Sequence, residues 1–115
     1  MRRMASVQVG ADAVVIALRR TEKIEALHGD LTIPRASITR AIHVPDGLAE
    51  ISGIRAPGLG IPGHAMVGTF RDEGTRTFAA CHGHRPAVLL ELVDQPFDRV
   101  ILTVEDPEAV LAQLA

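Results

Sequence analysis

The chain has 115 residues, a formal net charge of −2, and 47% hydrophobic but only 3% aromatic residues. This length fits one domain, which we take to span residues 1–115, and this hydrophobic content excludes a disordered chain. Because base-stacking proteins need exposed aromatic rings and excess basic charge, the composition argues against nucleic acid. Cys81 is the single cysteine, and no apolar run reaches the length of a membrane helix. We therefore expect a cytoplasmic protein.

Short apolar segments in the first half predict four strands, at 6–9, 13–18, 31–33 and 38–44. Between the second and third strands, residues 21–29 predict a short helix that is capped by Thr21 and ended by Gly29. One helical turn is expected at 46–51. All of 52–63, which is rich in glycine and proline, is expected to be a loop.

The second half has the more regular pattern. Four further strands are predicted, at 64–70, 76–81, 86–93 and 97–104. Alternation places two sets of apolar residues on one face of their strands: Val88, Leu90, Leu92, and Val100, Leu102, Val104. Short strands with tight turns predict an antiparallel meander. A closing helix follows, with Asp106 as its N-cap and Pro107 at its first position.

The segment "GLGIPG", residues 58–63, has the glycine spacing of a dinucleotide-binding fingerprint. That fingerprint works between a strand and a helix whose N-terminus faces the pyrophosphate. Here the flanking segments predict no such helix, and Pro62 lacks the N–H that a phosphate nest requires. We therefore expect no nucleotide and no other cofactor, and we interpret these glycines as a shaped connecting loop.

The segments "GIRAPGLGIPG", "GTF" at 68–70, "PAVLLEL" and "DPEAVLAQL" together resemble the small bacterial pleckstrin-homology-like (PH-like) domains. The earlier "EKIEALHGDLTIPRASI" fits the same pattern, so the resemblance covers about residues 6–114. It implies a mainly β (α+β) fold: a strongly bent antiparallel sheet, or partly open barrel, of about seven strands capped by a C-terminal helix. Fold alone does not fix function.

The chain differs from the lipid-binding eukaryotic members of the PH-like family. Those members carry a basic motif across their first two strands. Here basic and acidic side chains are interleaved instead: Arg19, Arg20, Glu22, Lys23 and Glu25. The tryptophan often found in their capping helix is replaced by Leu111 or Leu114. Phosphoinositide binding therefore does not follow from the resemblance.

The segment "CHGHR", residues 81–85, is the strongest local candidate for chemistry. Cys81, His82 and His84 are possible zinc ligands, but a closed zinc site needs four ligands and no second cluster supplies the rest. Adjacent residues of a strand point to opposite faces, so His82 does not activate Cys81 as a nucleophile. We expect a buried Cys81, no metal site, no catalytic residues and no enzyme activity.

Five cationic or titratable side chains could form a patch for a carboxylate, a phosphate or a partner protein: Arg55, His64, His82, His84 and Arg85. The closing helix is apolar nearly all round, with Gln113 as its polar residue away from the ends. This pattern, together with open sheet edges, favours a homo-oligomer, most simply a two-fold dimer. We therefore expect a non-catalytic binding or self-association module. A peripheral binder of anionic lipid or of a small anionic ligand, and a small metal protein or enzyme, stay open as alternatives.

Overall fold

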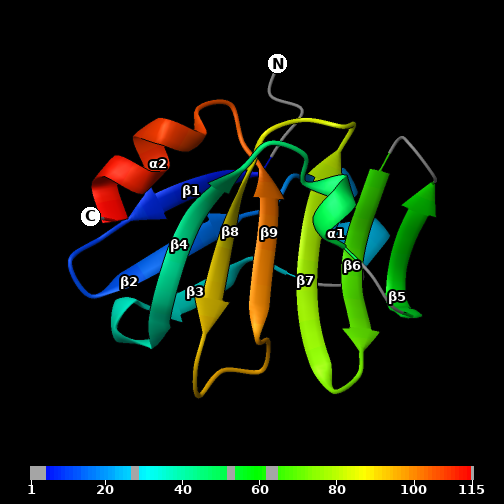
Figure 1. The fold of residues 1–115 in the computed structure, drawn as a ribbon, viewed down its shortest axis with the longest axis horizontal. Coiled ribbons are helices and arrows are strands. Elements are labelled where there is room, and N and C mark those ends of the chain that lie inside the picture. Colours follow the sequence, from blue (N-terminus) through cyan, green and yellow to red (C-terminus); the bar gives the residue numbers. More distant parts are fainter. Residues whose placement is uncertain (1–4, 27–28, 52–53, 62–64, 115) are drawn as a thin grey trace.

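The computed structural model describes residues 5–26, 29–51, 54–61 and 65–114, and it gives the backbone alone for 24–26 and 54–61. Within these residues the chain is mainly β with a C-terminal helix, as expected (Figure 1). The expectation of one bent sheet of about seven strands is wrong, because the strands form two sheets, of three and six strands. The sheets do not close into a barrel in the part of the chain so described. Neither of its two α-helices is long and apolar enough to cross a membrane.

The smaller sheet is antiparallel and contains β1 (Ser6–Val9), β2 (Ala13–Ala17) and β3 (Leu31–Pro34), in that order. The helix α1 (Arg20–Ala26) lies between β2 and β3 in the chain. Thr21 is not its N-cap, contrary to the prediction. The Arg19 amide instead donates to Glu22 Oε1 at 2.8 Å, so the glutamate three residues further on satisfies the first free amide of the helix.

The larger sheet has the order β4-β8-β9-β7-β6-β5. Its strands are β4 (Ile38–Val44), β5 (Ile54–Ile61), β6 (Ala65–Asp72), β7 (Thr75–His82), β8 (Ala87–Leu92) and β9 (Arg99–Thr103). The expected antiparallel meander is wrong at one place, because β7 and β9 are parallel neighbours. Strands β8 and β9 are apolar on both faces, and such strands occupy the middle of a covered sheet.

The expectation that all of 52–63 is a loop is also wrong, since 54–61 forms β5. This strand pairs antiparallel with β6, and its register shifts between Arg55 and Gly58. Pro57 lies within that irregularity, on a strand that has a neighbour on one side only. Because proline donates no ladder hydrogen bond, a bulge in an edge strand is where a sheet tolerates it.

The two sheets lie one behind the other, and the main core fills the space between them (Figure 1). Ile16 and Ile33 of the small sheet meet Phe78, Leu90 and Leu102 of the large one in this core. Every residue of the two predicted apolar sets belongs to it, which confirms their assignment to one face. Burial of these side chains is the main favourable contribution to folding.

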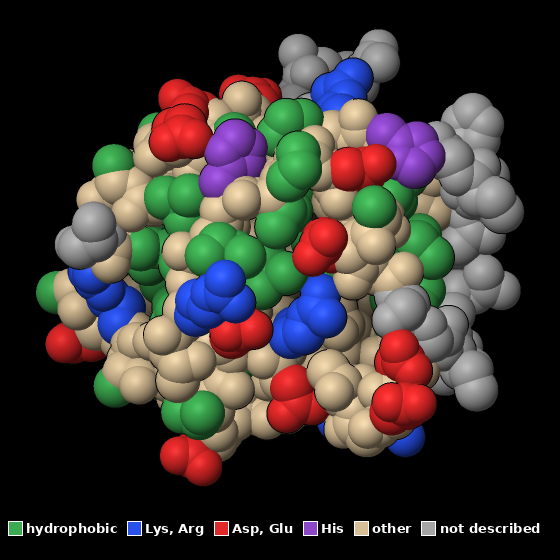
Figure 2. All heavy atoms as spheres, viewed as in Figure 1, with side chains coloured by type: hydrophobic (Ala, Val, Ile, Leu, Met, Phe, Trp, Pro, Cys, Tyr) green, Lys and Arg blue, Asp and Glu red, His purple; other side chains and the backbone are tan. Residues whose placement is uncertain are grey.

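The opposite face of the large sheet, which includes Thr103, is also largely covered. A second apolar cluster there includes Phe70, Leu89 and Ile101 and lies under the 3₁₀ turn Leu48–Glu50. Thr103 is fully buried, and its hydroxyl donates to the Ala80 carbonyl at 3.4 Å and accepts from the His82 amide at 3.2 Å. Figure 2 shows the resulting surface, with apolar side chains among acidic, basic and histidine ones.

The C-terminal helix α2 (Pro107–Leu114) starts as predicted. Asp106 Oδ1 accepts the Ala109 amide at 3.1 Å, which makes Asp106 the N-cap. The helix packs near β4, β1 and β8, with Val110 buried in the main core and Leu111 and Leu114 partly buried against it.

Candidate functional site

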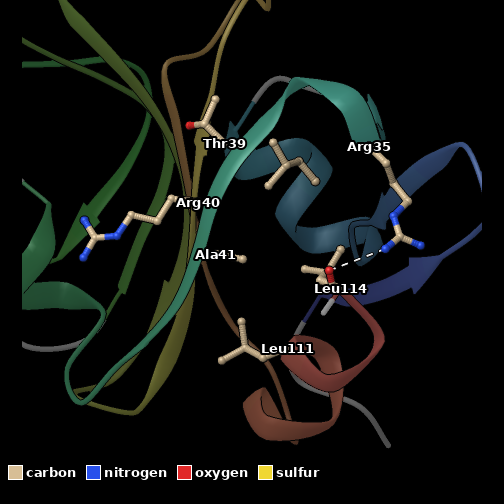
Figure 3. Close-up of a pocket in the computed structure, with 7 residues that line it drawn as sticks. Arg35, Thr39, Arg40, Ala41, Leu111 and Leu114 are labelled. Atoms are coloured by element: carbon tan, nitrogen blue, oxygen red, sulfur yellow. Dashed lines mark hydrogen bonds between the residues drawn. The ribbon is translucent and has the colours of Figure 1, made fainter.

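A groove runs between strand β4 and helix α2, at the edge of the large sheet (Figure 3). It encloses about 350 Å³. Its lining residues come from β4, from α2 and from the 3₁₀ turn η1 (Arg35–Ser37): Arg35, Ile38, Thr39, Arg40, Ala41, Leu111 and Leu114. The groove therefore brings together segments about seventy residues apart in the chain.

Strand β4 has a neighbour, β8, on one side only, so its other edge is unpaired within the described residues. In Figure 3, Ala41 lies on the side of β4 that faces α2, whereas the Arg40 side chain extends to the opposite side. Successive side chains of a strand point to opposite faces of the sheet, so the two faces of β4 carry different side chains. One face is apolar, and the other carries Arg40 beside Ile42 and Val44, which pack on the second apolar cluster.

The apolar face of the groove is formed by four partly buried side chains that also pack on the main core: Ile38, Ala41, Leu111 and Leu114. Arg35 closes one end. Its Nη2 donates to the Leu114 carbonyl at 3.4 Å and its Nη1 to the Gly10 carbonyl at 3.2 Å. Arg35 thereby satisfies a carbonyl of the last turn of α2, where a cation is electrostatically favourable.

The outer face of β4 carries the Arg40 guanidinium, which lies 3.7 Å from Glu91 on β8. The Arg40 side chain is 58% exposed, so solvent screens this ion pair strongly. At the other end of β4, His43 Nδ1 lies 2.9 Å from Glu108 Oε1 of α2. This contact and the Arg35 hydrogen bond hold the helix beside the strand at two places.

The predicted patch divides into residues that the structure describes and residues that it does not. Arg55 lies in β5, where the backbone alone is described, and His64 lies outside the described residues. His82, His84 and Arg85 are close in the chain around Gly83, which has a φ of 72° at the turn. The anion or partner patch as a whole stays a prediction.

Both described histidines of the patch contact carboxylates. His82 Nε2 lies 2.9 Å from Glu22 Oε2, and Glu22 is fully buried under this contact. His84 Nδ1 lies 2.7 Å from Asp46 Oδ2. Neither carboxylate was predicted from the sequence. The one available signal was the position of Glu22, three residues after Arg19, which is typical of a carboxylate that caps a helix.

Asp46 also accepts the Ala49 amide at 3.3 Å, at the start of the 3₁₀ turn. Desolvation raises the pKa of the Asp46 carboxyl, but the hydrogen bonds from His84 and Ala49 together lower it more. The pKa therefore lies below its ordinary value of 3.8. The Asp46 carboxylate thereby occupies a ring nitrogen of His84 that another anion would need.

Cys81 is buried, as expected, and its thiol donates to the Ile101 carbonyl at 3.5 Å. Burial raises the pKa of the thiol to about 12, so the thiolate is scarce at neutral pH. No group of three or more histidine, cysteine, aspartate or glutamate residues is placed to hold a metal ion among the residues that the structure describes.

Comparison of the chain with protein-family models, with curated proteins and with solved structures found no match.

Proposed function

We propose that this chain is a PH-like domain that acts as a non-catalytic binding module and holds an extended segment of a partner protein along β4. The PH-like assignment rests on the resemblance described above. The open edge of β4, with the groove beside it, is the observation that supports the binding function. An unpaired strand edge offers a row of backbone donors and acceptors that an added strand can use.

The two faces of β4 define the side chains that such a segment needs. Alternate residues of an added strand face the groove, where Ile38, Ala41 and Leu111 offer apolar surface. The residues between them face the outer side, beside the exposed Arg40. Directly opposed side chains of neighbouring strands contact each other, and opposite charges there are favourable. The preferred segment therefore alternates apolar and acidic residues.

The inner layer, formed by α2 and the small sheet, extends beyond the edge of β4 (Figure 1). This shape favours a peptide as the added strand over the β4 strand of a second copy of the chain. In Figure 1, α2 and the β1–β2 hairpin extend beyond the edge of β4. We expect a single added strand to lie over this part of the inner layer. A second copy that paired through β4 would bring its own inner layer into the same space, because a two-fold axis places equal surfaces against each other.

Binding of two seven-residue peptides tests the proposal. One alternates valine and glutamate, the other valine and lysine, and amide chemical shifts of the ¹⁵N-labelled protein report the site. We expect the glutamate peptide to shift the β4 amides and to bind at least about fivefold tighter than the lysine peptide. Methylation of the peptide nitrogens that face β4 should abolish binding, since it removes the ladder hydrogen bonds.

An Arg40→Gln variant provides the matched test of charge, because Arg40 is exposed and its loss leaves the core intact. In this variant the preference for the glutamate peptide should disappear, while binding of both peptides persists through the strand edge. Equal binding of the two peptides to the unaltered protein, or shifts that map away from β4, would refute the proposal. So would undiminished binding of the methylated peptide.

We propose self-association through α2 as a second candidate. Ala109, Ala112 and Gln113 of this helix are exposed. The small alanine side chains allow two helices to approach closely, and a two-fold dimer is the simplest closed arrangement. Light scattering over a dilution series tests it. A dimer mass that Ala112→Glu converts to a monomer mass supports this arrangement, and a monomer mass at every concentration excludes it.

A further inference from the structure

A second hollow lies between the two sheets and does not share residues with the β4 groove. It encloses about 420 Å³, between the outer edge of β3 and the β8–β9 connection. We call it the β3 cleft, and its lining residues are Asp30, Leu31, Thr32, Ile33, Thr69, Arg76, Leu92, Gln95, Pro96 and Phe97. Small-molecule sites in proteins have similar sizes and form between structural layers in the same way.

Apolar side chains contribute to both walls of the β3 cleft, beside polar ones from Asp30, Thr32, Thr69 and Gln95. Leu31 and Ile33 contribute from β3, and Leu92 and Phe97 contribute from the end of β8 and the connection that follows it. All four side chains belong to the main core, so packing fixes their positions. A ligand with an apolar body would therefore meet a surface that is already formed.

Arg76 provides the one guanidinium that lines this cleft. Its Cζ atom lies 5.2 Å from the centre of the Phe97 ring, and its Nη1 donates to the Pro96 carbonyl at 3.1 Å. Its Nε is buried and has no hydrogen-bond partner. No carboxylate among the described residues forms an ion pair with this guanidinium. Asp30 also lines the cleft, but its carboxylate is paired with Lys23 at 3.5 Å.

We propose that the β3 cleft binds a small amphipathic carboxylate, with its apolar chain against Leu31, Ile33 and Phe97 and its carboxylate on Arg76. A guanidinium suits this role because its planar fork matches a carboxylate. The ring of Phe97 and the Pro96 carbonyl hold the fork in place before the ligand arrives. This site is independent of the strand-binding edge and of the cationic residues around Gly83.

Titration calorimetry with decanoate and with decanamide tests the proposal on the unaltered protein. The two probes have the same chain, and the carboxylate alone distinguishes them. We expect decanoate to bind at least about tenfold tighter than decanamide, as a charge-assisted hydrogen bond implies. Amide shifts caused by decanoate should map to β3 and to residues 93–97. Equal binding of the two probes, no binding of decanoate, or shifts confined to another surface would overturn the proposal.

The variants Arg76→Gln and Arg71→Gln separate the local role of Arg76 from the effect of net charge. Arg71 is the exposed cross-strand neighbour of Arg76 and does not line the cleft. Arg76→Gln should remove the preference for decanoate over decanamide, and Arg71→Gln should retain it. Thermal unfolding shows whether each variant is folded. If Arg76→Gln does not fold, the comparison of the two probes on the unaltered protein decides the question by itself.

Discussion

Glu22 Oε2 lies 2.9 Å from His82 Nε2, although the two residues are sixty positions apart in the chain. The other carboxylate oxygen, Oε1, accepts the Arg19 amide at 2.8 Å. One fully buried carboxylate therefore both starts α1 and ties this helix to the end of β7. Removing a buried charge partner leaves its neighbours without their hydrogen bonds, which costs far more than losing an exposed pair.

We predict that Glu22→Ala lowers the free energy of unfolding by about 3 kcal/mol, because it leaves the Arg19 amide and His82 without this acceptor. The matched control is Glu108→Ala. Glu108 also lies 2.9 Å from a histidine, His43, but its side chain is 76% exposed, so we expect a loss of about 0.5 kcal/mol or less. Urea unfolding measures both. Similar losses in the two variants would contradict the buried role of Glu22.

The pairing of Asp46 with His84 predicts a dependence of stability on acid pH. The folded protein holds the pKa of Asp46 below the ordinary 3.8, so the unfolded chain takes up this proton first as the pH falls. The contribution of Asp46 is therefore complete above pH 3.8 and is lost as the pH falls through the lower, folded-state value. Asp46→Asn should reduce the urea midpoint at pH 7 more than at pH 3. An equal reduction at both values would contradict this linkage.

The Cys81 thiol is predicted to be unreactive in the folded protein. Its pKa of about 12 and its complete burial both oppose thiolate chemistry at neutral pH. Iodoacetamide at pH 8 should therefore modify Cys81 slowly in buffer and rapidly in urea above the unfolding midpoint, as measured by mass spectrometry. Rapid modification without urea would show that the region around Cys81 opens readily.

Gly47 is predicted to be required for close packing and not for backbone freedom. Its φ of −63° suits any residue, but a Cβ atom there would lie 2.8 Å from Ala87 Cβ and 3.1 Å from Cys81 Sγ. Gly47→Ala should therefore lower the free energy of unfolding by about 2 kcal/mol through overpacking. A second substitution, Ala87→Gly, should restore part of this loss. Gly29→Ala is the control, because a Cβ atom there has nothing within 4 Å.

The β6–β7 hairpin turns through Glu73 and Gly74, which have φ angles of 49° and 86°. Two successive positive values are typical of a type I′ turn, in which asparagine is preferred at the first position. Glu73→Asn should therefore raise the free energy of unfolding by about 0.5–1 kcal/mol. Gly74→Ala should lower it. Thermal unfolding measures both, and a destabilising Glu73→Asn would contradict the conformational argument.

Local features of this fold were predictable because their causes are local. The limits of β4, the cap at Asp106 and the single turn at 48–50 follow from side-chain alternation, a capping carboxylate and a short polar stretch. The pairing order of the strands was not predictable in this way. The apolar alternation in β8 and β9 predicted strands with one buried face, but it did not specify that β9 would lie beside β7.

The candidate sites depend on contacts between distant parts of the chain. The Arg35 guanidinium reaches the Leu114 carbonyl, 79 positions further on, and no local pattern links the two. The same holds for Arg76 and the connection that carries Phe97, which β9 brings back beside β7. Residue type identified His82 and His84, at the connection between β7 and β8, as candidates. Their carboxylate partners, Glu22 and Asp46, could be recognised only from the assembled fold.

The pairing of β9 with both β7 and β8 makes this strand the link within the large sheet. Strand β9 joins β5, β6 and β7 on one side to β4 and β8 on the other. Without residues 99–103, the large sheet would be in two parts, each with an additional open edge. A state of the chain in which β9 is displaced therefore exposes the edges of two apolar strands, β7 and β8, and such edges favour aggregation.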